Sequence, residues 1–73
     1  MNETDYKKLL ATKSCPNGDL EGADLRGEDL HKANLSGSNL TGANLTGANL
    51  IEADLTGANL TDADLTEADL GYA

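Results

Sequence analysis

The chain has 73 residues, five of them basic and thirteen acidic, with a formal net charge of −8. A chain this short forms one domain with a thin core, and its excess of acid disfavours nucleic acids and anionic membranes as partners, because both bind through Lys and Arg. It contains no Phe or Trp and no apolar run of membrane-spanning length, so we expect an aliphatic core and no membrane partner. We expect a soluble chain, in the cytoplasm or, after removal of a leader, in the periplasm or thylakoid lumen.

Residues 1–15 are predicted to form a cap, with a helix from about Thr4 to Thr12 followed by a short lead-in. Three apolar residues share one face of this helix at i, i+3, i+4 spacing: Tyr6, Leu9 and Leu10. A helix of this length is not stable alone, so it is expected to cover the N-terminal end of the core. Cys15 lies five residues before Leu20, in phase with the leucines that follow, and is expected to be a small core residue near the cap.

From Leu20 to Leu70, every fifth residue is leucine. The residue before each leucine is always Asp or Asn, the residue two before it is usually Ala, and the residue two after it is commonly Gly. The predicted core therefore consists of eleven leucines: Leu20, Leu25, Leu30, Leu35, Leu40, Leu45, Leu50, Leu55, Leu60, Leu65 and Leu70.

A period of five fits neither ordinary element. Steps of five residues advance by about 140° around an α-helix and alternate between the two faces of a β-strand. Only a chain that bends by a similar angle every five residues directs all the leucines inward. The glycines that commonly stand two residues after a leucine fit this interpretation, because tight turns often need a positive φ.

Units such as Ala43-Asn44-Leu45-Thr46-Gly47 resemble the A-(D/N)-L-x-x consensus of the pentapeptide-repeat family over residues 16–70. This resemblance implies an all-β fold, a right-handed quadrilateral parallel β-helix with four repeats per coil and just under three coils. The lead-in from Leu9 to Pro16 resembles that of small cyanobacterial members. Residues 71–73 are left as a C-terminal tail, too short to cover the last coil, so the open strand edge is expected to allow end-to-end self-association.

The Asp or Asn before each leucine is interpreted as a turn residue, whose side chain bonds to nearby backbone. The alternative is an acidic ladder that binds cations. We predict no metal or cofactor site, because the single His31 and single Cys15 give no ligand cluster. Glu28 occupies an inward-leaning position and is expected to bend outward or to pair, while Lys32 and Glu52, twenty residues apart, are expected to form an exposed ion pair.

No nucleophile–base pair is evident and a leucine-filled core leaves no pocket, so we expect no catalytic residues and no enzymatic activity. The leading hypothesis is a non-catalytic structural or protein-interaction module whose partner is unknown. Its candidate surface consists of exposed threonines and acids: Thr41, Thr46, Asp54, Thr56, Thr61, Asp62, Asp64, Thr66, Glu67 and Asp69.

A second hypothesis comes from the resemblance, because the family includes rods that bind type II topoisomerases by imitating DNA. Residues 16–70 carry eleven acidic and two basic residues, a net charge of −9. Just under three coils are only ~13 Å tall, which corresponds to about four base pairs of DNA. The charge density is similar to that of DNA, but the length is too short, and the hypothesis ranks second for that reason.

Overall fold

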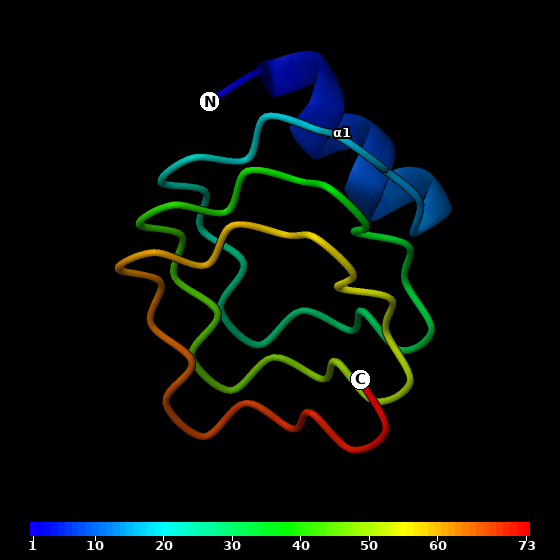
Figure 1. The fold of residues 1–73 in the computed structure, drawn as a ribbon, viewed down its shortest axis with the longest axis vertical. Coiled ribbons are helices and arrows are strands. Elements are labelled where there is room, and N and C mark those ends of the chain that lie inside the picture. Colours follow the sequence, from blue (N-terminus) through cyan, green and yellow to red (C-terminus); the bar gives the residue numbers. More distant parts are fainter.

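The computed structural model describes residues 1–73 and places one helix, α1 (Glu3–Thr12), against one end of a stack of coils (Figure 1). Asn2 caps the helix, with its Oδ1 accepting the Asp5 N–H at 3.1 Å. The helix ends at Lys13, which adopts a left-handed conformation and donates its N–H to the Leu9 carbonyl at 2.8 Å. The predicted N-terminal helix is confirmed, and it begins one residue earlier than expected.

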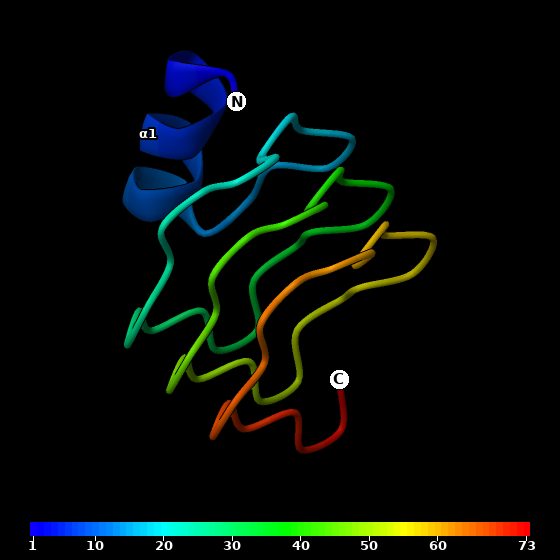
Figure 2. The same cartoon turned by 90° about the vertical axis from the view of Figure 1, so that its left-hand side faces the viewer.

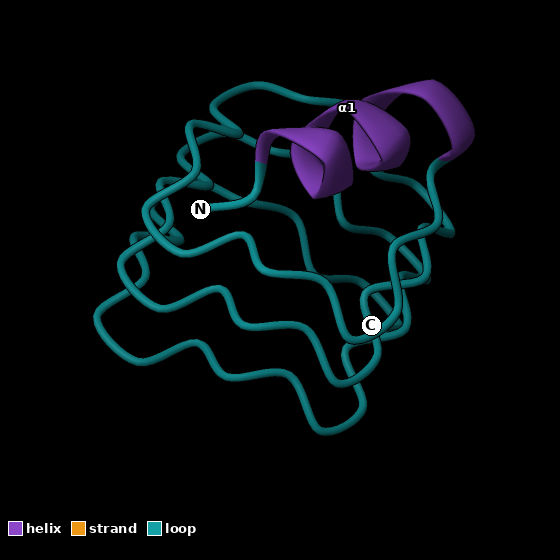
Figure 3. Cartoon of the chain, turned by 90° about the horizontal axis from the view of Figure 1, so that it is seen from above, coloured by secondary structure: helices purple, strands orange, loops and turns teal.

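The rest of the chain winds into layers that pair with one another at a separation of twenty residues (Figure 2). Eight isolated parallel bridges define this register, running from Ser14–Asn34 to Asn49–Asp69. The pairing residue is the Asp or Asn before each leucine, or Ser14 in the first bridge. No extended strand forms, and Figure 3 shows only loop outside α1, because two turn residues interrupt the pairing in every repeat.

Each repeat turns a corner through one hydrogen bond and one left-handed residue. The N–H of Ala23 donates to the carbonyl of Leu20 at 3.0 Å, and equivalent bonds recur along the chain. The residue two after each leucine has a φ between 58° and 70°, as at the third position of a type II turn. Six of these residues are glycine, and five are not: Lys32, Glu52, Asp62, Glu67 and Tyr72. The backbone geometry therefore repeats even where the glycine is absent.

The core follows the predicted leucine ladder, but its burial decreases toward the C-terminus. The seven leucines from Leu20 to Leu50 are fully buried, together with Leu9 of α1 and Cys15. Leu55, Leu60 and Leu65 are only partly buried, and Leu70 is 40% exposed. The expectation that Leu70 belongs to the core is wrong, because no further coil lies against that end of the stack.

Cys15 fills the core position nearest the cap, and two neighbouring positions differ from the repeat to accommodate it. At position 18, where the repeat usually has Ala, a Cβ would overlap the Cys15 Sγ, so Gly18 leaves the space the thiol needs. Ser38 is fully buried, and its hydroxyl donates to the Cys15 carbonyl at 2.8 Å. Burial, reinforced by the Asp5 carboxylate, raises the pKa of the Cys15 thiol. The thiol is thus held neutral in the packed interior.

Helix α1 closes the N-terminal end through three polar contacts in addition to the burial of Leu9. The Asn2 N–H donates to the Asp19 carbonyl at 3.0 Å, and the Asp19 N–H donates to the Asp5 carboxylate at 2.9 Å. The Tyr6 hydroxyl donates to the Asp24 carbonyl at 2.8 Å. These bonds satisfy backbone groups of the first coil that have no coil beyond them.

Candidate interaction surfaces

The Asp or Asn of each repeat closes a turn. In all eleven repeats its Oδ1 accepts the backbone N–H two residues later, at 3.0–3.3 Å. Because this bond is present in every repeat, it explains the invariant Asp or Asn without any ligand. No group of three or more His, Cys, Asp or Glu side chains is placed to hold a metal ion.

Several hydroxyls that follow the leucines are also bonded within their own repeats. The side chains of Thr46, Thr61 and Thr66 donate to the Oδ1 of the preceding Asn or Asp at 2.5–2.6 Å. Ser36 makes the same contact at 2.7 Å. No such bond forms at Thr41, so this threonine keeps its hydroxyl available to a partner.

The ten residues of the candidate surface do not form one flat face. The twenty-residue register stacks Thr41 over Thr61 and Thr46 over Thr66, while Thr56 lies on a further side of the coil. Eight of the ten residues fall within the last twenty residues of the chain. The structure therefore places most of the predicted surface around the C-terminal edge of the stack.

This edge is strongly acidic. Six carboxylates follow Lys32, the last basic residue in the chain. Five of them lie in the last coil, and we call these five residues the acidic rim: Asp54, Asp62, Asp64, Glu67 and Asp69. Glu52 lies one coil earlier, where its N–H donates to the Gly71 carbonyl at 2.8 Å. Hydrogen bonds from Thr56 and Thr66 lower the pKa values of Asp54 and Asp64, respectively. Both groups therefore carry their charge over a wider pH range than an isolated aspartate does.

Only one ion pair is present in the structure. Arg26 donates from Nε and Nη2 to the two carboxylate oxygens of Asp24, both at 2.9 Å. This arginine lowers the pKa of Asp24 to about 2. The expected pairing of Lys32 with Glu52 is wrong; both residues are exposed, and such a pair gains little over solvation by water. Glu28 is half-buried, and its carboxylate makes neither a hydrogen bond nor an ion pair.

The C-terminal edge also exposes apolar surface and unpaired backbone. Within the stack, each leucine N–H donates to a carbonyl of the following coil, as Leu20 does to Asn39 at 2.8 Å. Residues of the last coil have no following coil, so eight of their N–H groups have no protein acceptor: Leu55, Gly57, Leu60, Asp62, Leu65, Glu67, Leu70 and Tyr72. We call this edge, with its four leucines from Leu55 to Leu70, the open end.

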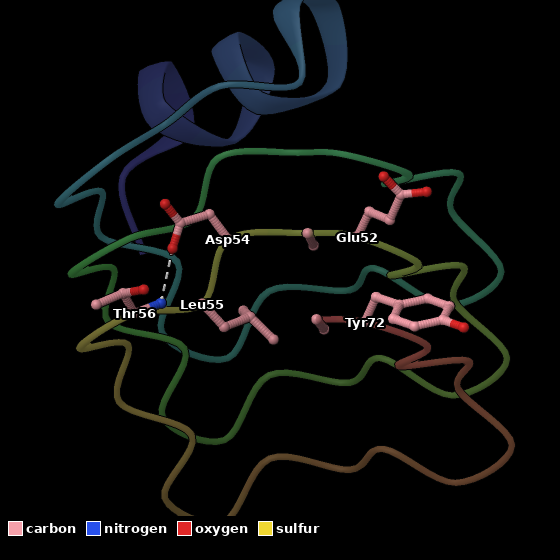
Figure 4. A pocket seen from close by; sticks show the side chains of 7 residues that line it. Glu52, Asp54, Leu55, Thr56 and Tyr72 are labelled. Carbon is pink, nitrogen blue, oxygen red and sulfur yellow. Dashed lines mark hydrogen bonds between the residues drawn. The ribbon is translucent and has the colours of Figure 1, made fainter.

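One hollow of about 510 Å³ opens beside this end, beneath residues 52–56 and next to Tyr72 and Ala73. Figure 4 shows the ring of Tyr72 pointing away from Leu55. Tyr72 is 94% exposed and therefore does not cover the leucines. The hollow lies between residues 52–56 and the end of the last coil at Tyr72 and Ala73.

Comparison with known families agrees with this architecture. The family model for pentapeptide repeats, of eight copies, matches residues 17–50 and 43–73. The chain belongs to the pentapeptide-repeat family. No curated protein sequence matches it. The predicted family and its β-helix-like repeat fold are thereby established.

Solved pentapeptide-repeat proteins from cyanobacteria and a plant resemble the chain. Rfr23 from the cyanobacterium Cyanothece 51142 is 39% identical over 77% of this chain, with a TM-score of 0.65. A pentapeptide-repeat protein from Nostoc PCC 7120 is 30% identical over 93% of this chain and 74% of its own, with a TM-score of 0.43. One from the Arabidopsis thaliana thylakoid lumen is 33% identical over 85% of this chain and 50% of its own, with a TM-score of 0.39. The chain spans 42% of the length of Rfr23.

Two features of the site could not be located from the repeat alone. One is the cluster of unpaired N–H groups, which exists only because one coil has no neighbour. The other is the bidentate contact between Arg26 and Asp24, which requires a side-chain conformation that the spacing does not specify.

No helix in the structure is long and apolar enough to cross a membrane.

Proposed function

We propose that this pentapeptide-repeat chain is a non-catalytic module that presents its outer faces to a protein partner. The observation that carries this proposal is the division between interior and exterior. The interior is filled by leucine, alanine and Cys15, and the polar side chains stand outside in a repeating register. Such a body offers a rigid surface for recognition and no enclosed pocket for a substrate.

The family resemblance supplies the finer geometry of this proposal, a right-handed quadrilateral β-helix of just under three coils. In such a helix the four sides are separate surfaces. The side that stacks Thr41 over Thr61 and the adjacent side that stacks Thr46 over Thr66 form one continuous, threonine-lined surface. Because short side chains on a rigid backbone lose little entropy on binding, this surface suits protein recognition.

The test is quantitative capture from a lysate of the native host, with the wild-type chain and two matched variants. One variant, Thr41→Arg with Thr61→Arg, alters the threonine-lined surface. The control, His31→Arg with Ile51→Arg, makes the same number of changes on another side. We expect a partner that binds the wild type and the control but not the first variant. If the two variants capture the same set of proteins from the lysate, the proposal of a specific outer face fails.

DNA mimicry remains the weaker alternative. It draws support from the charge of −9 over residues 16–70, but the longest dimension of the molecule is 26 Å. That length corresponds to about eight base pairs of DNA. An inhibition assay of gyrase supercoiling at micromolar protein separates the two proposals, and we expect no inhibition.

The acidic ladder that binds cations is the last alternative. The Asp and Asn Oδ1 atoms already accept backbone N–H groups in every repeat, which weakens them as ligands. A melting temperature that is unchanged by millimolar calcium is the expected result. A rise in melting temperature with calcium would favour the ladder.

A further inference from the structure

One corner of the stack differs from the other three. In each repeat the two residues after the leucine form the corner, and the twenty-residue register stacks the corners of successive coils into four ridges. On one of these, the Lys32 N–H donates to the Ile51 carbonyl at 2.9 Å, and the Glu52 N–H donates to the Gly71 carbonyl at 2.8 Å. Figure 4 shows Glu52 and Tyr72 along this edge, one coil apart. We call it the Ile51 ridge: His31, Lys32, Ile51, Glu52, Gly71 and Tyr72.

The Ile51 ridge carries side chains where the other corners carry glycine. On each of the other three corners, two of the three left-handed positions are glycine, whereas here all three hold larger residues: Lys32, Glu52 and Tyr72. Ile51 adds an aliphatic side chain, and it is the only Ile or Val in the chain. Residues with a Cβ are strained at a positive φ, and residues held in such conformations cluster at functional sites. This corner therefore gives up stability for exposed side chains, as an interaction surface does.

Two opposite charges stand one above the other on this ridge without pairing. Lys32 and Glu52 are stacked in successive coils and both are exposed, yet no ion pair joins them. Each charged group is therefore open to a group on another molecule. Read from the cap toward the C-terminus, the ridge presents a positive charge and then a negative one. A second copy of the chain, turned end for end, presents the same two charges in the opposite order.

The ridge is thus complementary to itself in one arrangement only. When two copies lie side by side in opposite directions, related by a two-fold axis perpendicular to the stack, Lys32 of each copy faces Glu52 of the other. The same operation places the half-buried Ile51 against the exposed His31 of the second copy. In a parallel arrangement Lys32 would face Lys32 and Glu52 would face Glu52, and such contacts between like charges are unfavourable.

The faces on both sides of the ridge agree with the antiparallel arrangement. On one side Asp29 is stacked over Asn49, and on the other Asn34 is stacked over Asp54. The two-fold operation brings each of these aspartates against the asparagine of the second copy, so no carboxylate of the two paired coils faces another carboxylate.

The distribution of charge along the whole chain favours the same direction. Residues 1–32 contain all five basic residues and seven acidic ones, a net charge of −2, whereas residues 33–73 carry a net charge of −6. The antiparallel arrangement places the more acidic half of each copy beside the less acidic half of the other. This reduces the repulsion that two chains of charge −8 would otherwise experience.

We propose that the Ile51 ridge binds a second copy of this chain, side by side and antiparallel. Two contacts between Lys32 and Glu52 and the packing of Ile51 against His31 hold the pair together. The column of Thr41 and Thr61 lies ten residues, or two corners, away from the ridge and stays uncovered. The inference therefore goes beyond the proposed function: one assembly presents two threonine-lined surfaces, facing away from each other.

Sedimentation equilibrium of the full chain, over a concentration series up to millimolar at physiological ionic strength, tests this proposal. We expect the weight-average mass to rise reversibly from 7.6 kDa toward twice that value. Glu52→Lys lowers the net negative charge, so overall repulsion alone predicts tighter association. The ridge predicts the opposite, weakening by about tenfold or more, because two attractive contacts become repulsive. Lys32→Glu should weaken association to a similar degree.

Restoring the charge pattern should restore association. The double variant Lys32→Glu with Glu52→Lys should associate like the wild type, and an equimolar mixture of the two single variants should form a mixed pair.

Glu67→Lys is the matched control, since it makes the same change as Glu52→Lys at a left-handed position on another corner; it should not weaken association. Ile51→Thr, which introduces the residue found at five equivalent positions, should weaken association by about threefold. Circular dichroism checks that each variant is folded.

Several outcomes would overturn the proposal. A chain that stays monomeric at millimolar concentration has no self-complementary ridge. Association that both single charge reversals leave unchanged uses another surface, such as the ends of the stack. If the double variant stays monomeric, the contact between Lys32 and Glu52 is not what joins the copies. A monomeric chain that loses a captured protein on Ile51→Thr binds a different partner at the ridge.

Failure of this inference is distinguishable from failure of the proposed function. Thr41→Arg with Thr61→Arg should associate like the wild type while losing the captured partner. The capture control, His31→Arg with Ile51→Arg, should be monomeric and still capture it. The two readouts therefore depend on different corners of the stack.

Discussion

At the scale of single residues, the repeat demands a left-handed backbone two residues after every leucine. Glycine occupies that position in six repeats, but Lys32 and Glu67 are among the five other residues that adopt it. A side chain with a Cβ loses about 1–2 kcal/mol there relative to a right-handed conformation. The hydrogen bonds of the surrounding turns and the stacked coils hold these residues in place against that preference.

Replacing either residue with glycine should therefore stabilise the fold. We expect Lys32→Gly and Glu67→Gly each to raise the free energy of unfolding by about 0.5–1 kcal/mol, after allowance for the greater entropy of unfolded glycine. Because Lys32 and Glu67 have opposite charges, an effect of the lost charge on the free energy of unfolding would have opposite signs in the two variants. Urea unfolding monitored by circular dichroism measures the change.

Glu21→Gly is the control for this pair, since Glu21 is also exposed but has no positive φ. It should lower the free energy of unfolding by about 0.5–1 kcal/mol. If all three glycine variants shift stability in the same direction, the left-handed positions are not the cause.

A second residue-scale prediction concerns Asp24, whose pKa Arg26 lowers to about 2. A carboxyl group whose pKa is lower in the folded state stabilises the fold above its unfolded pKa of about 3.9. That contribution is lost as the pH falls from about 4 through about 2. In Arg26→Gln the pKa of Asp24 should rise toward its ordinary value of 3.8, with the backbone N–H of residue 26 still bonded.

Carboxyl ¹³C NMR titration measures this pKa directly. Lys32→Gln removes one positive charge without touching Asp24, and it should leave the pKa of Asp24 almost unchanged. An equal rise in both variants would mean that overall charge, and not the bidentate contact, sets the pKa.

At the scale of elements, α1 is held by its own cap and by its contacts with the first coil. The Asn2 side chain accepts the Asp5 N–H, and the Asp5 side chain in turn accepts the Asp19 N–H. The start of the helix and the entrance to the stack are therefore linked through adjacent hydrogen bonds. The short helix is stable because it is packed, not because of its intrinsic propensity.

Asn2→Ala should lower the free energy of unfolding by about 1 kcal/mol, because the Asp5 N–H loses its acceptor. Asn2→Asp should retain most of the stability, since aspartate is an equally good N-cap. Thermal unfolding of the three proteins tests this order. Equal stability of the alanine and aspartate variants would show that the cap contributes nothing.

At the scale of the whole molecule, stability is distributed unevenly along the stack. Each interior coil has a neighbour on both sides, whereas the last coil has one. In repeat folds, stability is approximately a sum of contributions from each repeat and from each contact with a neighbour. The last coil should therefore be the least stable part of the molecule.

A matched pair of leucine substitutions tests this gradient. Leu40→Ala removes a fully buried side chain and should cost about 2–5 kcal/mol. Leu60→Ala, twenty residues later on the same side of the stack, should cost less than half as much because Leu60 is already partly exposed. Urea unfolding measures the change in the free energy of unfolding for both variants. If Leu40→Ala is already unfolded in water, its cost is counted at the upper end of the expected range. Equal costs would show that the last coil is as well packed as the interior.

The amino-acid sequence by itself determined the repeat, its phase and most of the core. A leucine at every fifth position favours a fold with all these side chains on one side of the chain, so the sequence assigns Leu20 to Leu70 and Cys15 to the interior. The structure buries Leu20 to Leu50 and Cys15 and leaves Leu70 exposed. The helix near Thr4–Thr12 followed from its apolar spacing. The turn role of the Asp and Asn residues followed from their short polar side chains.

Only the tertiary structure decided which leucines are actually covered and where the polar side chains meet. Burial depends on the coil above and the coil below, and a periodic sequence gives every repeat the same expectation. Leu70 is exposed because its lower neighbour is absent, and Lys32 and Glu52 remain apart because exposed side chains gain little from pairing. The open end, with its unpaired N–H groups, is for the same reason a property of the stack and not of any single repeat.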